Sequence, residues 1–265
     1  MRLARVDEGD GPPVVFWHGE PTWSFLWRKV IPPVREAGFR CLAPDLPGFG
    51  RSEKPRDVGW FTYDRLVDEA KGFVEELDLR DATFVVHDWG GPIGLRAAME
   101  LGDRVTRLVV LNTGLFTGEQ RMSDAWQAFR DFVERTEDLP VGMLVRGGCG
   151  EDPGDEVIAQ YDAPFPTPAD KAGPRALPLL IPTSPDAPGA AEGRATLERL
   201  REWNGPLLML WGEDDPIIPP KTGDRFAAAI GRPPPERIAG ASHFLQEDAG
   251  ERVGRRIAEW LREAG

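Results

Sequence analysis

Residues 82–94, Ala-Thr-Phe-Val-Val-His-Asp-Trp-Gly-Gly-Pro-Ile-Gly, place a β-rich run, a sharp turn and a helical run in immediate succession. Residues 83–86 are β-branched or aromatic, as is typical of a strand. The glycines that follow let a strained turn lie close to the neighbouring backbone. A chain with this succession favours a sheet from whose strand end a helix departs at once.

Asp88 stands in this turn, where hydrolases of the G-x-S-x-G type carry serine on a nucleophile elbow. Position 86 is Val where the serine pattern has Gly. A carboxylate with an ordinary pKa of about 3.9 is ionised at pH 7 and attacks an electrophilic carbon without a base. Such attack suits alkyl halides or epoxides, and water must then cleave the resulting ester. The alternative is that Asp88 only caps the helix starting at Trp89.

Short apolar runs alternate with helical patterns over the first 111 residues. We expect strands at residues 1–6, 14–17, 39–43, 83–86, 105–111, 206–211 and 236–239. Helices are expected around Leu26–Val34, after the capping residue Thr62, and over residues 224–230. This order predicts an α/β fold, a mostly parallel sheet with helices on both faces.

The alternation stops between Thr113 and about Thr196. One amphipathic helix is predicted from Ser123 to about Arg135, and residues 152–190 are dense in proline and glycine. We interpret this segment as an inserted helical cap. The predicted division is a core of residues 1–113 and 196–265 with a cap of residues 114–195.

Composition limits the kind of partner. A net charge of −12 makes binding to a nucleic-acid backbone unfavourable and repels anionic substrates, so we expect a small neutral substrate. Cys41 and Cys149 show neither metal-ligand nor disulfide spacing. Without an apolar run of about 18 residues or a signal-like start, we predict a cytoplasmic protein that does not bind membranes, with no metal and no cofactor.

Asp215 and His243 each follow a predicted strand, at the edge where α/β sheets build their sites. The chain order nucleophile, acid, histidine is that of the elbow-bearing fold. Of the other two histidines, His18 is expected to be structural, and His87 to point away from the nucleophile that it precedes. The alternatives are that Asp215 is a turn residue and His243 a histidine of a surface loop.

Five motifs together resemble the haloalkane dehalogenases, and the likeness covers nearly the whole chain. They are HGEPTW at 18–23, APDLPGFGRS at 43–52, HDWGG at 87–91, YDAPFP at 161–166 and SHFLQED at 242–248. The likeness is closest to the subgroup whose acid follows the strand after the cap and whose His-Gly-x-Pro turn lacks Asn. The resemblance implies an α/β-hydrolase fold.

The resemblance also implies roles for individual residues. Asp88 would displace halide from an sp³ carbon to give an alkyl ester. His243 would then activate the hydrolytic water, while Asp215 orients and stabilises the imidazolium of His243. Backbone N–H groups of Glu20 and Trp89 would form the oxyanion hole. The indole N–H of Trp89 would bind the halide. The partners implied are a halogenated substrate, water and halide, in a monomer or small homo-oligomer.

Two departures from the family pattern matter. The chain begins inside the family's second strand, which predicts seven strands and an exposed edge. The family's second halide-binding tryptophan falls on Phe129, a pocket residue without an N–H. Trp126 lies three residues earlier on the same helix face, so we expect it to be the second donor. The alternative is that Trp126 only packs under the cap and Trp89 works alone.

Three other functions compete with dehalogenation of neutral haloalkanes. An epoxide hydrolase resembles this chain but needs two cap tyrosines, and of Tyr63 and Tyr161 only the second lies in the cap. A haloacid dehalogenase would place arginine after the nucleophile, where this chain has Trp89. A non-catalytic ligand-binding relative would be expected to lack part of the triad, and no member is missing.

Overall fold

The computed structural model describes residues 1–264, which form a seven-stranded sheet in the order β1-β3-β2-β4-β5-β6-β7. The strands are β1 (Arg5–Glu8), β2 (Pro13–Trp17), β3 (Arg40–Pro44), β4 (Ala82–His87), β5 (Val105–Leu111), β6 (Leu207–Gly212) and β7 (Glu236–Ile238). Every pairing is parallel except that of β1 with β3. The predicted mostly parallel sheet of seven strands is confirmed, with β1 at an edge.

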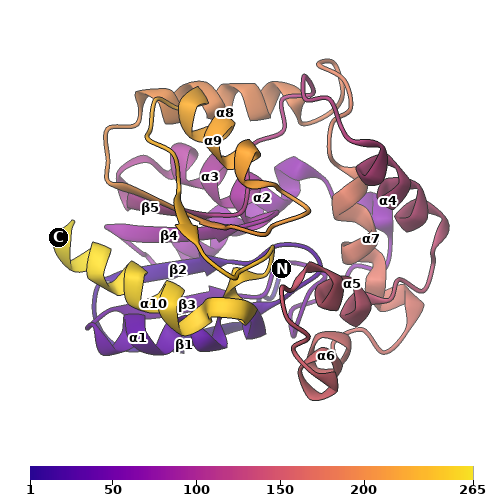
Figure 1. Ribbon diagram of the computed structural model, residues 1–265, viewed down its shortest axis with the longest axis horizontal. Helices are drawn as coiled ribbons and strands as arrows, with labels where there is room; N and C mark the ends of the chain where they lie inside the picture. Colours follow the sequence, from indigo (N-terminus) through magenta and orange to yellow (C-terminus); the bar gives the residue numbers. More distant parts are fainter. Residues whose placement is uncertain (265) are drawn as a thin grey trace.

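Helices cover both faces of the sheet (Figure 1). One face carries α1 (Ile31–Glu36) and α10 (Leu245–Glu263), and the other carries α2 (Tyr63–Glu76), α3 (Gly90–Leu101), α8 (Ala190–Glu202) and α9 (Pro220–Ala229). Alternate residues of β4 separate the two cores: Phe84 and Val86 face the α2–α3 layer, while Val85 faces the α1–α10 layer. This is the two-residue period of a strand that is buried on both faces.

Two predicted helices differ in their boundaries. The segment expected to be a helix around Leu26–Val34, disturbed at Pro32-Pro33, is a 3₁₀ helix, Ser24–Lys29, followed by α1. Pro32 and Pro33 cause the change, because proline is accepted in the first turn of a helix and breaks its interior. The helix expected over residues 224–230 begins earlier, at Pro220. Thr62 caps α2 as predicted, its hydroxyl accepting from the Arg65 amide at 3.2 Å.

Four helices lie between β5 and α8: α4 (Asp124–Arg135), α5 (Val141–Gly148), α6 (Asp155–Asp162) and α7 (Ala172–Leu179). Figure 1 shows them gathered beside the sheet and its helical layers. Only α4 was expected as a defined helix, because the others are short and bounded by Pro or Gly. The predicted core boundary at 195/196 falls inside α8, which packs on α3. We propose that the cap comprises α4–α7 and ends before α8.

Candidate active site

Asp88 occupies the turn between β4 and α3 with a φ of +47°, in the left-handed region. Gly90, two residues later, has no room for a side chain, since a Cβ there would lie 2.1 Å from the Trp17 carbonyl oxygen. The Thr113 hydroxyl fixes the turn by donating to the Asp88 carbonyl at 2.5 Å. The sharp turn predicted from sequence is therefore present. The N-cap residue of α3 is Trp89, so the capping alternative for Asp88 does not describe this structure.

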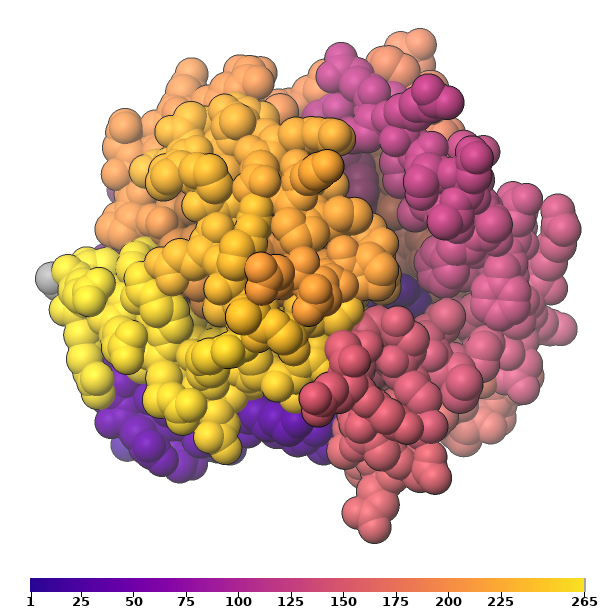
Figure 2. Space-filling model, viewed as in Figure 1, coloured from indigo at the N-terminus to yellow at the C-terminus, as the bar shows by residue number. Residues whose placement is uncertain are grey.

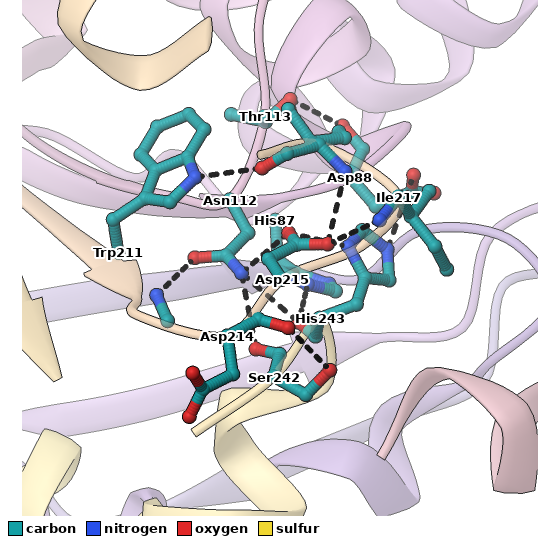
Figure 3. A network of polar contacts seen from close by, with 12 residues as sticks. His87, Asp88, Asn112, Thr113, Trp211, Asp214, Asp215, Ile217, Ser242 and His243 are labelled. Atoms are coloured by element: carbon teal, nitrogen blue, oxygen red, sulfur yellow. Dashed lines mark hydrogen bonds and ion pairs between the residues drawn. The ribbon is translucent and has the colours of Figure 1, made fainter. Parts of the chain in front are cut away.

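His243 lies between two carboxylates (Figure 3). Its Nδ1 is 3.0 Å from Oδ2 of Asp215, and its Nε2 is 3.6 Å from Oδ2 of Asp88. The Asp88 side chain is 15% exposed, against 2% for His243 and 0% for Asp215. His243 is thus not a surface-loop histidine, and Asp88 alone of the three retains an exposed edge that a substrate can reach.

The charges of the three groups support one another. Burial opposes a charge on His243, but the charge and hydrogen bond of Asp215, together with Asp88, outweigh it and raise the pKa of His243 to about 10. Burial likewise opposes ionisation of Asp88, yet its polar contact and charge interaction with His243 lower the pKa of that carboxyl below its ordinary value. At neutral pH the site therefore holds an imidazolium between two carboxylates.

The second oxygen of Asp88 is held by backbone. The Glu20 amide donates to Oδ1 of Asp88 at 2.7 Å, and the Trp89 amide also favours the ionised carboxylate. Gly19 is required beside them, since a Cβ there would lie 2.2 Å from Oδ1 of Asp88. The two amides proposed from sequence for the oxyanion hole are thus brought to the nucleophile.

The Glu20 side chain has no such partner. Its Oε1 is buried and makes no hydrogen bond within residues 1–264. Burial first, and then the charge of Asp88, raise the pKa of this carboxyl well above its ordinary value. Glu20 therefore contributes its backbone amide to the nucleophile, while burial and the Asp88 charge disfavour ionisation of its own carboxyl.

Asn112 is a site residue that sequence reasoning missed. Its Nδ2 donates to Oδ2 of Asp215 at 2.7 Å and to the Ser242 carbonyl at 3.1 Å, while its Oδ1 accepts from the Gly212 amide at 2.9 Å. Asn112 directly follows β5, as Asp88 follows β4. Because the carboxyl ends of parallel strands meet at one edge, that position was the signal available in the sequence.

The other two histidines are both engaged with backbone. Nε2 of His18 accepts from the Leu46 amide at 2.8 Å, so its Nδ1 donates to the Gly19 carbonyl at 2.9 Å, a structural role as expected. The His87 ring is turned toward the backbone of His243. Its Nε2 lies 2.9 Å from the carbonyl oxygen of His243, because the turn at Asp88 aims the end of β4 at the loop that carries His243.

The residues considered for halide binding are Trp89 at the start of α3 and Trp126 and Phe129 on α4. Trp89 is buried against the rings of Tyr63 and Phe116, with centroid separations of 6.5 and 5.5 Å. Trp126 is half-buried and packs against the hydrophobic core on the α2–α3 side of the sheet, which also includes Trp89. Phe129 is half-buried and does not belong to that core. Within residues 1–264 neither the Trp89 nor the Trp126 indole N–H donates to a protein acceptor.

The hydroxyl groups of both tyrosines of the chain already donate hydrogen bonds within the protein. The Tyr161 hydroxyl donates to the buried carboxylate of Glu247, which is paired with Arg28, and the Tyr63 hydroxyl donates to the Pro92 carbonyl at 2.8 Å. Burial and the neighbouring Glu247 charge raise the pKa of Tyr161 well above its ordinary value. Neither phenol is placed to protonate an oxygen held at Asp88.

The molecular surface is hollowed between the cap helices (magenta to rose) and the segment after β6 (orange), with N-terminal residues (indigo) at the bottom (Figure 2). No group of three or more His, Cys, Asp or Glu that could hold a metal ion occurs in residues 1–264. Over the same range no helix has the length and apolar character needed to span a bilayer.

Comparison with known proteins identifies relatives of this chain. A family model for the alpha/beta hydrolase fold matches residues 12–145. A haloalkane dehalogenase of Mycobacterium marinum is 45% identical over 98% of this chain and 89% of that protein. Haloalkane dehalogenase 1 of Mycobacterium tuberculosis is 46% identical over 94% and 83%. A tetrameric haloalkane dehalogenase of Paraglaciecola agarilytica superposes with a TM-score of 0.89 at 35% identity, over 96% of this chain and 86% of that one.

Proposed function

The chain belongs to the haloalkane dehalogenase family of α/β hydrolases, and we propose that Asp88, His243 and Asp215 carry out its reaction. The activity is hydrolytic dehalogenation, which turns a haloalkane and water into an alcohol, a halide ion and a proton. The observation that carries the residue assignment is the placement of His243 Nε2 at 3.6 Å from Asp88 and Nδ1 at 3.0 Å from Asp215.

The first step is a displacement at carbon. Oδ1 of Asp88 is held by the Glu20 amide, so Oδ2 is the oxygen that attacks the carbon bearing the halogen. The carbon–halogen bond breaks, the halide ion leaves, and an alkyl ester of Asp88 remains. The lowered pKa of Asp88 supports this role, because the carboxylate is ionised before any substrate binds.

The second step is hydrolysis of that ester. Ester formation removes the charge of Asp88 that helps to raise the pKa of His243, and so favours the neutral imidazole that a general base must present. Nε2 of His243 takes a proton from water while the oxygen attacks Cγ of Asp88. The amides of Glu20 and Trp89 stabilise the oxyanion that forms. When it collapses, the bond from Cγ to the alkyl oxygen breaks, the alkyl oxygen takes the proton from Nε2 of His243 and leaves as the alcohol, and the Asp88 carboxyl loses a proton to return to carboxylate.

The substrate is proposed to be a small neutral haloalkane. Trp89 follows the nucleophile and offers an indole N–H to the leaving halide, and Trp126 is the proposed second donor. No basic side chain is hydrogen-bonded or ion-paired to Asp88 within residues 1–264 apart from His243. A carboxylate-bearing substrate therefore finds no counter-ion beside the nucleophile. The cytoplasmic location and a monomeric or small homo-oligomeric state remain predictions.

Epoxide hydrolysis is disfavoured by the tyrosines. With the same nucleophile, epoxide hydrolysis needs tyrosine hydroxyls that protonate the epoxide oxygen. Here the Tyr161 hydroxyl is hydrogen-bonded to Glu247 and the Tyr63 hydroxyl to the Pro92 carbonyl. Halide release from 1,2-dibromoethane, measured beside diol formation from styrene oxide, tests the assignment. We expect bromide release and no diol. Diol formation without bromide release would replace the proposal by the epoxide reaction, and turnover of neither would favour a non-catalytic relative.

A further inference from the structure

A second buried imidazole lies directly behind the base. His87 ends β4 and immediately precedes the nucleophile, and its ring centroid is 4.9 Å from that of His243 (Figure 3). Its Nε2 is 2.9 Å from the His243 carbonyl oxygen. A carbonyl oxygen only accepts hydrogen bonds, so Nε2 of His87 carries the proton and donates it.

The other ring nitrogen fixes the charge state. Nδ1 of His87 is buried and has no hydrogen-bond partner within residues 1–264. Protonating it would bury an N–H without an acceptor beside the cationic ring of His243, which is costly. In agreement, burial first and the His243 charge second lower the pKa of His87 to about 4. His87 is therefore a neutral donor that does not repel the imidazolium next to it.

The main chain of His243 has few other side-chain contacts. Nδ2 of Asn112 approaches the same carbonyl oxygen only at 3.4 Å and is shared with Asp215 and Ser242. The next residue, Phe244, is anchored by its amide to the Gly148 carbonyl at 3.1 Å. The bond from His87 is thus the shorter of the two side-chain hydrogen bonds that fix the backbone of the base.

We propose that His87 is a positioning residue, whose hydrogen bond to the His243 carbonyl sets the place of the base relative to the nucleophile. The inference rests on the proposed function, since it assigns His87 to the step that His243 performs. The position of Asp88, which performs the alkylation step, is fixed by the Glu20 amide, Thr113 and the glycines of the turn, and not by the His87 ring. Hydrolysis of the ester depends on where Nε2 of His243 stands.

Two substitutions separate this role from simple packing. His87→Met keeps a similar apolar volume and removes the donor, whereas His87→Gln restores an N–H at a similar reach. We expect His87→Met to keep the rate of the first-turnover bromide burst and to slow ester hydrolysis about tenfold to a hundredfold, the cost of a base displaced by up to 1 Å. His87→Gln should recover most of the loss. Equal slowing of burst and steady state, or no recovery in His87→Gln, would overturn the proposal.

A spectroscopic measurement tests the contact without turnover. The chain has three histidines, so the ¹⁵N-histidine spectrum resolves His243 with His18 as an internal reference. His87→Met should shift the His243 ring signals, including its Nδ1–H bonded to Asp215, and leave those of His18 in place. Unshifted His243 signals would refute the positioning role. If wild-type protein releases no bromide, the proposed function fails, while these spectra still decide the contact. Should His87→Met not fold, His87→Asn, whose amide is one bond shorter, takes its place beside His87→Gln.

Discussion

Nε2 of His243 lies 3.6 Å from Oδ2 of Asp88, so the base and the nucleophile form an ion pair before substrate binds. This contact and Asp215 raise the pKa of His243 from 6.5 to about 10 against the opposing effect of burial. A group whose pKa is raised by folding stabilises the folded state fully below its unfolded pKa. That stabilisation is present below about pH 6.5 and is lost as the pH rises through about 10.

Thermal denaturation between pH 6 and 10.5 measures this effect. We expect the Tm of the wild-type protein to fall over that window, and the fall to be smaller in Asp88→Asn, which removes one of the two carboxylates. His243→Phe, which has no imidazole, serves as the reference for all other titrating groups. Identical pH profiles for wild type and His243→Phe would contradict the ion pair.

The proposed division of labour between Asp88 and His243 predicts different defects. Asp88→Ala should abolish turnover of brominated alkanes, because the carboxylate that forms the ester is removed. His243→Phe should still release one bromide per molecule and then stop, because the base acts only in ester hydrolysis. Rapid-quench bromide release together with the intact mass of the alkylated protein checks both outcomes. The absence of a stoichiometric burst in His243→Phe would count against this sequence of steps.

The third prediction concerns Asn112, which holds the proposed catalytic acid Asp215 through a hydrogen bond. Asn112→Ala removes the donor to Asp215 and leaves the buried Gly212 amide without an acceptor, at a cost of about 1–3 kcal/mol in stability. Turnover should fall as well, since Asp215 loses a side-chain contact that orients it. The φ of Asn112 is +33°, so part of the cost is backbone strain. Asp81→Ala, at an exposed residue with a φ of +51°, measures strain alone. Equal losses in the two variants would remove Asn112 from the site.

The elbow and the triad could be predicted because each residue follows a strand of a parallel sheet. Strand ends share an edge, so Asp88, Asp215 and His243 converge whatever the intervening chain does. The same rule applies to Asn112, which follows β5, but an asparagine side chain is not itself a nucleophile, acid or base, so nothing in the sequence was a reason to select it. The hydrogen bond of His87 to the His243 carbonyl could not be predicted, because it depends on the path of a loop 156 residues away. The short cap helices escaped prediction because tertiary packing, rather than a long periodic pattern, stabilises them.

Glu20 offers a test that separates its backbone from its side chain. Glu20→Gln keeps the amide that binds Asp88, so the bromide burst should persist. Burial and then the charge of Asp88 raise the pKa of the Glu20 carboxyl well above its ordinary 4.5, and this costs stability once the pH exceeds that ordinary value. Glutamine has no such cost. The Tm of Glu20→Gln relative to wild type should therefore increase as the pH rises above about 4.5. A constant difference across pH would show that the wild-type carboxyl ionises freely.

The remaining prediction concerns the second halide donor. Trp126 lies three residues before Phe129 on α4 and carries the indole N–H that Phe129 lacks, so we propose it as the cap-side donor. The guanidinium carbon of Arg130 lies 5.7 Å from the Trp126 ring and adds positive charge on the cap side. A hydrogen bond to a charged group contributes about 1.5–3 kcal/mol, or roughly ten- to a hundredfold in affinity. Removing this donor should therefore produce a change that a titration resolves.

Trp126→Phe should weaken bromide binding by roughly tenfold to a hundredfold, measured by titrating intrinsic fluorescence, and should slow bromide release in the burst. Phenylalanine keeps an aromatic ring at this position but removes the N–H together with the five-membered part of the indole, so the comparison with a gain-of-donor variant is needed. Phe129→Trp is the matched gain-of-donor variant on the same helix. If Trp126→Phe leaves affinity and turnover unchanged, Trp126 is not the donor. Tighter bromide binding in Phe129→Trp alone would then show that the natural enzyme holds its halide through the single indole of Trp89.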